Sequence, residues 1–183
     1  MRRFLTRRIP PFTRVLLVES GSRNLLERII PYIYSVSPSA EIDVVTCYSG
    51  APAGLREGSN VFRTADYPDG APRAALVKHL NSREFAVIGI ICSGEPIMTK
   101  WKWWLAAKVP AKLLVLNENA DWFWVDRGNW RVVLHFMFFR AGLTGEGAAP
   151  AIARLLVFPF TLLYLLAFAG WVHFRRAIRL LAR

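Results

Sequence analysis

Cysteine and histidine are scarce in this sequence, which contains two cysteines and three histidines in 183 residues. Cys47 and Cys92 each close an apolar run, a position typical of buried, reduced thiols in a cytosolic domain, so the sequence indicates no disulfide framework. His79, His135 and His173 lie far from one another and from the cysteines along the chain, which argues against a metal site. We therefore expect neither a metal nor another cofactor.

Glycine-rich nucleotide motifs are also missing. The first apolar run is followed by ESGSRN, residues 19–24, which has one glycine where a dinucleotide-binding turn needs GxGxxG, and the sequence has no P-loop. The CSG at Cys92 could mark a nucleophile, but no histidine is close to it in sequence, and a core thiol is the favoured interpretation. The residues alone assign no catalytic group.

Acidic residues are few, 13 against 24 lysines and arginines, which gives a formal net charge of +11. Such a charge favours an acidic partner: nucleic acid, anionic lipid or a phosphorylated substrate. Nucleic acid is the weakest of the three, because the basic residues gather near the two chain ends beside apolar sequence rather than along one helix face. Residues 1–13 form a basic tail without the apolar run of a secretory signal, and its arginines could contact lipid phosphates or remain solvated.

Alternating strand and helix patterns over residues 14–125 predict a Rossmann-like α/β domain with a doubly wound, parallel, five-stranded sheet in the order 3-2-1-4-5. The expected strands are residues 14–19, 41–47, 60–65, 86–91 and 112–116. The expected helices start near Asn24, which has capping-box spacing to Glu27, near Pro72, and at Glu95-Pro96. We expect Trp104 to pack on the sheet while the neighbouring lysines, Lys100 and Lys102 among them, face water or lipid.

The carboxyl ends of the strands supply the candidate binding site, because open α/β sheets place ligands there and the first and fourth strands would be neighbours at the switch point. A helix N-terminus after each of two turns, with Lys100, would favour an anionic group. A well-made connection without a ligand is the alternative interpretation. The candidate ligand-binding residues are Ser20, Gly21, Ser22, Ser93, Gly94, Glu95, Lys100, Asn117, Glu118 and Asn119.

Residues 126–183 differ in composition from the rest and predict membrane-associated helices. Residues 155–174 carry no formal charge over about 20 positions, the length of a bilayer span, and Arg175-Arg176 follow them. Residues 130–139 are apolar but too short to span upright. A single span and a helical hairpin that dips into one leaflet, with a bend near Pro159, are both open. We favour the hairpin, because it keeps the α/β domain on the cytoplasmic side of the inner (cytoplasmic) membrane.

Four segments carry a resemblance to a known family: RVLLVESGS from Arg14, the helix ending IIP at Pro31, SPSAEIDVVT from Ser37, and FAVIGIICSGEPIMTKWKWWLAAKVPAK from Phe85. Over about residues 14–120 the chain resembles the N-terminal, acceptor-side domain of GT-B glycosyltransferases, particularly the heptosyltransferase-like family. That family places an acidic catalytic residue, preceded by glycine, in the turn after the first strand. Here that place holds Ser22, Arg23 and Asn24.

The resemblance implies a membrane-associated, glycosyltransferase-related protein of envelope polysaccharide or glycolipid assembly that binds an anionic sugar or a lipid-linked acceptor. The nucleotide-sugar-binding half of a GT-B enzyme has no counterpart in these residues, so a separate partner protein would supply it. The expected partners are thus membrane lipid, a lipid-linked or phosphorylated sugar, and that second protein. The alternative is a non-catalytic membrane adaptor that recruits partner proteins.

Overall fold

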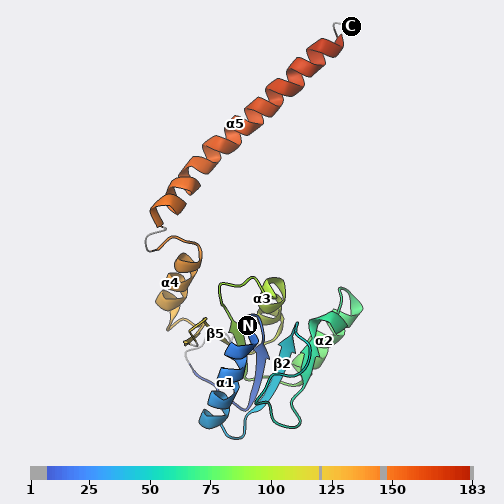
Figure 1. The fold of residues 1–183 in the computed structure, drawn as a ribbon, viewed down its shortest axis with the longest axis vertical. Helices are drawn as coiled ribbons and strands as arrows, with labels where there is room; N and C mark the ends of the chain where they lie inside the picture. The colour runs from blue at the N-terminus through green and yellow to red at the C-terminus, as the bar shows by residue number, and fades with distance from the viewer. Residues whose placement is uncertain (1–7, 120, 145–147, 182–183) are drawn as a thin grey trace. The chain divides into compact units, whose positions relative to one another are not determined.

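The computed structural model describes residues 8–119, 121–144 and 148–181. The chain divides into two compact units, Met1–Trp130 and Arg131–Arg183. The first contains the sheet and three α-helices, and the second contains the two C-terminal helices (Figure 1). Each unit is described by itself.

The first unit is built on a six-stranded, mostly parallel sheet in the order β3-β2-β1-β4-β5-β6. Its strands are β1 (Arg14–Val18), β2 (Glu41–Thr46), β3 (Val61–Arg63), β4 (Val87–Ile91), β5 (Lys112–Leu116) and β6 (Trp122–Trp124). The expected order and parallel pairing of the first five strands are confirmed. The expectation of a wholly parallel, five-stranded sheet is wrong, because β6 turns back and pairs antiparallel with β5.

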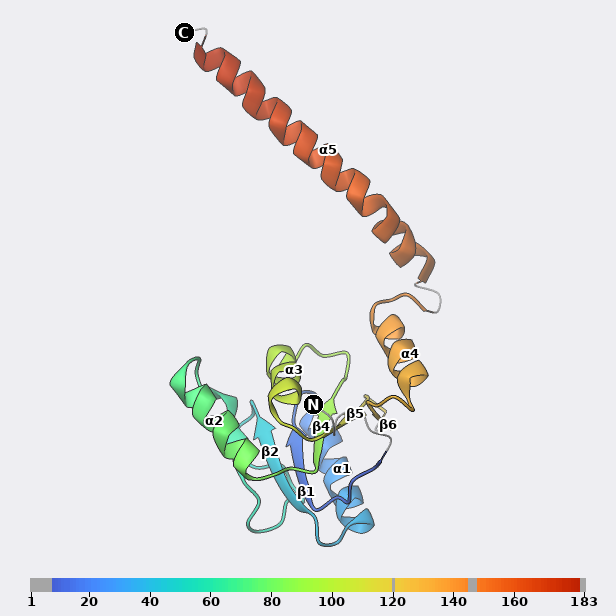
Figure 2. The same ribbon diagram turned by 180° about the vertical axis from the view of Figure 1, so that it is seen from behind.

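Helices cover both faces of this Rossmann-like sheet (Figures 1 and 2). Helix α1 (Arg23–Val36) buries Ile30 and Ile33 against Val15 and Leu17 of β1. Because side chains alternate along a strand, Leu16 faces the opposite side, where the other helices supply buried leucines. Those helices are α2 (Ala71–Ser82) and α3 (Thr99–Lys108), preceded by the short 3-10 helix η1 (Thr64–Asp66). Coverage of both faces explains the continuous apolar runs of the central strands.

Helix α3 begins later than expected. The strand β4 is followed by an irregular loop, residues 92–98, and the helix starts at Thr99 rather than at Glu95-Pro96. Met98 precedes it in the left-handed conformation, with φ of 50°. The turn at Gly94 and Glu95 therefore does not lie at a helix N-terminus, and the expectation that two such termini flank the site is half wrong.

Helix α1 begins within one residue of its expected start, but the expected capping box is not observed. Its N-cap is Ser22, and the carboxylate of Glu27 accepts a hydrogen bond from the Ala53 N–H at 2.9 Å instead of closing a capping box with Asn24. The helix passes through Pro31 and continues to Val36. Tertiary contacts, here with the loop after β2, override the local capping signal.

The second unit consists of α4 (Trp130–Arg140) and α5 (Ala148–Leu181). Helix α5 has 34 residues and continues through Pro159 without a break (Figure 1), so the expected bend near that proline is not observed. Among the described residues it is the one helix that is long and apolar enough, by length and composition, to cross a membrane, through Leu156–His173. The side chains of Arg175, Arg176 and Arg179, and Arg183 altogether, lie outside the described residues.

Candidate anion-binding site at the carboxyl edge of the sheet

The topological switch point of the sheet lies between β1 and β4, where the strand order changes direction. The turns after these two strands are in direct contact. The Ser20 hydroxyl donates a hydrogen bond to the Ile91 carbonyl at 2.7 Å, which ties the end of β1 to the end of β4. Gly21 lies so close to β4 that a Cβ there would be 2.5 Å from Ile91 Cγ2 and 2.9 Å from Ser93 Oγ. A glycine is required at this position because no side chain fits. The expected adjacency of the two turns is thus observed.

Lys102 brings a buried positive charge to the same point. It is 5% exposed, and its Nζ donates to the Ile91 carbonyl at 3.3 Å, the same oxygen that Ser20 uses. Within the part of the chain that the structure describes, no carboxylate forms a salt bridge with this ammonium. An ion of this size loses on the order of several kcal/mol of hydration when it is buried, and a neutral carbonyl compensates only part of that loss.

Ser93 adds a second incomplete polar group. Its hydroxyl oxygen is buried and has no hydrogen-bond partner. The Lys102 ammonium and the Ser93 hydroxyl are therefore the available donors at the end of β4, and they suit a compact anion with several acceptor oxygens, such as a phosphate. The N-terminus of α1 begins directly after Gly21, and the Ser22 side chain makes no capping hydrogen bond there. The partial positive charge of a helix N-terminus acts in the same direction.

Glu19, the acidic residue closest to this point in sequence, is fully buried and already paired. Its two carboxylate oxygens accept hydrogen bonds from Arg23 Nε and Nη2 at 2.9 and 3.2 Å. This hydrogen bond with Glu19 raises the pKa of Arg23 above its ordinary value, so the guanidinium stays charged. The guanidinium also donates to the Ser49 and Gly50 carbonyls, which ties the β1 turn to the β2 loop. A carboxylate held this way is unsuited to act as a general base.

Tyr48 completes the contact between the β1 turn and the β2 loop. Its hydroxyl donates to the Gly21 carbonyl at 3.2 Å, and its ring lies 5.2 Å from the Arg23 guanidinium carbon. Burial raises the pKa of Tyr48, which keeps the hydroxyl protonated and able to donate at neutral pH. The side of Gly21 toward β2 is therefore occupied by internal hydrogen bonds, whereas the side toward β4 carries the unmatched donors.

The residues after β5 build a turn rather than the site. Asn117 Oδ1 accepts the N–H groups of Asn119 and Asp121, both at 2.9 Å, and Asn117 Nδ2 donates to the Asp121 carboxylate. These bonds reverse the chain so that β6 can pair with β5. Glu118 and Asn119 are exposed.

The ten residues expected at the site thus separate into three groups. Ser20, Gly21 and Ser93 meet at the β1–β4 contact. The exposed group consists of Ser22, Gly94, Glu95 and Lys100, and the β5 turn holds Asn117, Glu118 and Asn119.

The residue that sequence reasoning missed is Lys102, which it assigned to the solvent-facing side of the helix. The available signal was its spacing, three residues before Leu105 and seven before Val109, which puts all three on one helical face, and all three are buried.

The tryptophans of α3 contact an arginine from α2. The Arg73 guanidinium carbon lies 4.4 Å from the centroid of Trp101 and 5.5 Å from that of Trp104, and the two indoles meet edge to face at 5.3 Å. Trp104 is only partly buried and Trp103 is 48% exposed. This cluster joins α2 to α3.

The two cysteines follow β2 and β4 on either side of β1, as expected, but they differ in exposure. Cys92 is buried, whereas Cys47 is exposed, so the expectation of two buried thiols is wrong for Cys47. Desolvation around its sulfur nevertheless raises the pKa of Cys47, which disfavours the reactive thiolate at neutral pH. In the described ranges no three histidine, cysteine or carboxylate side chains are grouped so as to hold a metal ion.

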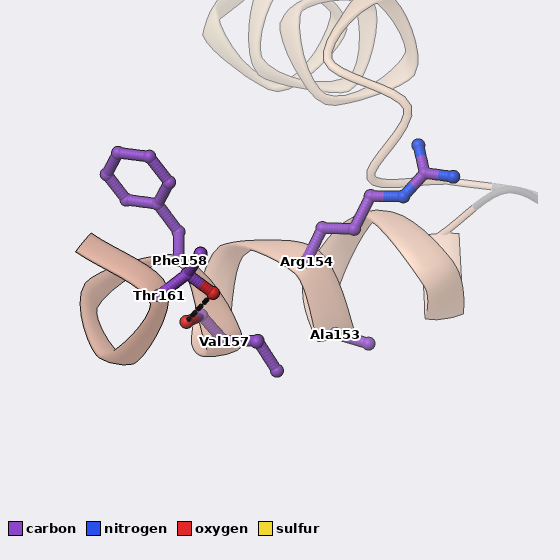
Figure 3. Close-up of a pocket in the computed structure, with 5 residues that line it drawn as sticks. All are labelled: Ala153, Arg154, Val157, Phe158 and Thr161. Carbon is purple, nitrogen blue, oxygen red and sulfur yellow. Dashed lines mark hydrogen bonds between the residues drawn. The ribbon is translucent and has the colours of Figure 1, made fainter. Parts of the chain in front are cut away.

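A separate hollow lies on one side of α5 and is lined by Ala153, Arg154, Val157, Phe158 and Thr161 (Figure 3). Its hydroxyl is already used, because Thr161 Oγ1 donates to the Val157 carbonyl at 3.2 Å. Apart from Arg154 and Thr161 the lining is apolar, and all five residues belong to α5. It offers few polar groups that could hold a substrate.

Comparison of the chain with protein-family profiles, with curated proteins and with solved structures finds no match in any of the three. The arguments about function therefore depend on the residues of this chain.

Proposed function

We propose that the protein is a membrane-anchored α/β domain that binds the phosphate group of a phosphorylated or lipid-linked sugar between the carboxyl ends of β1 and β4. The observation that carries the proposal is the Lys102 ammonium, buried at the switch point without a carboxylate partner among the described residues. A phosphate oxygen would supply that partner. The Ser93 hydroxyl, which has no hydrogen-bond partner, would donate to a further phosphate oxygen, whereas the proton of the Ser20 hydroxyl is already donated to the Ile91 carbonyl.

Ligand access in this proposal requires the loop of residues 92–98 to move, because Lys102 is enclosed. The loop has features of a segment that can rearrange at low cost. Met98 holds a left-handed conformation that a non-glycine residue adopts at a cost of about 1 kcal/mol, and the Ser93 hydroxyl has no partner to lose.

The membrane part of the proposal is supported by α5. Every residue of Leu156–His173 is unburied, and a helix of that composition in water would expose a large apolar surface. The continuous helix through Pro159 supports a single span rather than a re-entrant hairpin. We propose the cytoplasmic side of the inner membrane for the α/β domain because both of its cysteines are free thiols, as is usual in a reducing compartment.

The role in the cell that we propose is acceptor binding in envelope polysaccharide or glycolipid assembly. In this proposal the chain corresponds to the acceptor-side half of a GT-B enzyme, and a separate protein supplies the half that binds the nucleotide sugar. Both carboxylate oxygens of Glu19 are held by Arg23, which supports binding rather than catalysis by this chain alone. A second candidate is a non-catalytic adaptor. It is favoured by the internal hydrogen bonds of the rim, in which Arg23, Tyr48 and Asn117 are all satisfied by neighbouring backbone or turn residues.

Calorimetric titration of the detergent-solubilised full chain with glucose 1-phosphate, and separately with inorganic phosphate, tests the binding. We expect Lys102→Met to weaken binding at least tenfold and Lys100→Met, two residues away but exposed, to leave it unchanged. Equal effects of the two substitutions would assign the binding to general surface charge. Absence of binding by the wild-type chain would favour the adaptor.

A further inference from the structure

Helix α4 exposes nearly all of its apolar side chains. None of its residues is buried, and Met137 is 58% exposed. The other large exposed apolar side chains of the helix are Trp130, Val132, Leu134, Phe138 and Phe139. An 11-residue helix is about 16 Å long, half of the hydrocarbon thickness of a bilayer, so it cannot span one. A soluble surface helix of this composition would be an aggregation liability.

The polar and charged side chains of α4 limit which kind of surface the helix can contact. Arg131 and His135 are one turn apart and so share a side of the helix, and Met137 lies on roughly the opposite side, about 200° from His135. Arg140 lies at the C-terminal end, with its guanidinium carbon 5.4 Å from the Phe136 ring centroid. The helix contains no aspartate or glutamate. Arg131 and His135 form a narrow polar strip between Phe138 and Phe139, while Trp130 and Leu134 share the apolar side of Met137. The long side chain of such an arginine reaches lipid headgroups while apolar neighbours stay with the acyl chains.

Both ends of α4 are defined by the chain itself. Asp126 Oδ1 accepts the N–H groups of Gly128 and Asn129 at 2.8 and 3.0 Å, which fixes the turn immediately before Trp130. At the other end Gly142, with φ of 68°, closes a Schellman motif in which Gly142 N–H donates to Phe139 and Leu143 N–H donates to Phe138. The C-terminus of α4 is therefore defined by a capping motif in its own sequence.

The distance to α5 is limited by the connection. Residues 141–147 join the two helices and reach at most about 25 Å when fully extended. If α5 spans a bilayer with its apolar residues from Leu156 onward in the hydrocarbon, α4 cannot leave the neighbourhood of the headgroups. A lipid surface would thus always be within reach of α4.

We infer that α4 lies flat in the bilayer interface, with Met137 and its neighbours toward the acyl chains and Arg131 and His135 toward the headgroups. This inference depends on the proposed function only through the membrane insertion of α5. Helix α4 thereby forms a second membrane contact, joined to the α/β domain by the fixed turn of residues 126–129. The domain is held at the surface where lipid-borne phosphates lie.

Spin labels on the two sides of α4 test the inference in the full chain. Cys47→Ser removes the exposed native thiol, and Met137→Cys or His135→Cys is then labelled and reconstituted into vesicles of phosphatidylethanolamine and phosphatidylglycerol. We expect the label at 137 to be several-fold more accessible to oxygen than to a water-soluble nickel chelate, and the label at 135 to show the reverse. The matched pair shares one background and one helix.

Three outcomes would overturn the inference. Equal nickel accessibility at both positions would place α4 in water, low accessibility of both labels to both reagents would indicate packing against protein, and equal deep burial in lipid would indicate upright insertion. Carbonate extraction of the same labelled chains reports separately on α5. Chains that resist extraction but show no contrast between 137 and 135 would exclude the interfacial helix while leaving the membrane anchor intact.

Discussion

Leucine residues in the two units of this protein have opposite surroundings. Leu16, in the central strand β1, is fully buried, whereas Leu163, in α5, is 64% exposed. Leu16 lies in an apolar run of four residues, 15–18, and Leu163 lies in an uncharged run of about 20 residues in α5. The short run is enclosed by neighbouring strands and by helices on both faces, while the long one has no protein around it in its unit. The length of an apolar run, more than its residue types, therefore indicates which solvent it needs.

Charged residues sharpen the same contrast. The α/β unit buries several charges and pairs most of them, as in Lys112–Asp126 and Arg83–Asp43. Residues 155–174 of α5 contain none. Lys102 is the exception in the α/β unit, because it is buried without a carboxylate partner among the described residues. A buried charge that the protein does not pair is a reason to expect a ligand.

The largest expected effect comes from removing the long apolar run. Deletion of residues 151–183 should move the protein from the membrane fraction to the soluble fraction, because the apolar surface of α5 is lost with it. The intact chain should resist washing with high salt and with carbonate. Fractionation and immunoblotting measure both. Release of the intact chain by salt alone would show that the basic residues, rather than insertion, hold it at the membrane.

Breaking the buried ion pair of the α/β unit should give the next largest effect. Lys112 Nζ donates to Asp126 Oδ2 at 2.9 Å, and both side chains are almost fully buried. Asp126→Ala leaves the ammonium uncompensated and should lower the free energy of unfolding by about 3–5 kcal/mol in denaturant titrations. The double variant Lys112→Met with Asp126→Leu should recover part of that loss. A loss below about 1 kcal/mol in Asp126→Ala would contradict the importance of the pair.

Substitution of glycine by alanine should affect stability at a tightly packed position and not at an open one. Gly21→Ala should destabilise the α/β unit by about 1–3 kcal/mol, because the new Cβ would meet Ile91 Cγ2 at 2.5 Å. Gly170→Ala, in α5, meets nothing within 4 Å and should leave the unfolding midpoint of the α/β unit unchanged. Thermal unfolding followed by circular dichroism compares the two. Equal midpoints would mean that the β1–β4 contact can relax.

The contribution of Asp126 should depend on pH. Burial alone would raise the pKa of Asp126, but hydrogen bonds from Lys112 and from the Asn129 and Gly128 backbone outweigh it and hold the pKa below 3.8. A carboxyl whose pKa is depressed in the folded state stabilises the fold above pH 3.8, and that stabilisation is lost as the pH falls through the native pKa. The stability difference between wild type and Asp126→Asn should therefore be constant near neutral pH and shrink in acid. A difference that grows in acid would contradict the assignment.

The smallest expected effect is a gain in stability. Lys102→Met replaces a buried ammonium by an apolar side chain of similar length, and the ligand-free chain should become more stable by about 1 kcal/mol. Lys100→Met, at an exposed position, should change the stability by less than about 0.5 kcal/mol. Denaturant titration measures both. A destabilised Lys102→Met would indicate that the lysine supports the fold rather than a ligand.

The central sheet was predictable because its signals are local. Apolar runs gave β1, β2, β4 and β5, and the right-handed crossover rule gave their order. The strand β6 was not predictable in the same way, because its three aromatic residues are too few to show a periodicity. Its pairing with β5 also depends on the turn that Asn117 stabilises. The start of α3 was misplaced because Pro96 fits a first helical turn, and the left-handed Met98 carries no sequence signal.

The candidate site was predictable only as a location. The meeting of Ser20, Gly21 and Ser93 follows from the strand order alone. The cation at that point was missed because a lysine between tryptophans was taken to face water, although Lys102 shares a helical face with Leu105 and is buried with it. Burial of an ammonium depends on tertiary contacts such as the Ile91 carbonyl, which residue type alone does not indicate.

If the chain is anchored in a membrane as proposed, the two edges of its sheet have a consequence for how copies of it meet there. Both edge strands, β3 and β6, are three residues long, and β3 runs directly into η1, where Arg63 pairs with Asp66 at 3.2 Å. Confinement to a surface brings copies of a chain together at high local concentration, where long unpaired edges would template intermolecular sheets. Short edges offer too few free backbone groups for that pairing. The domain is therefore suited to crowding in two dimensions without polymerising through its sheet.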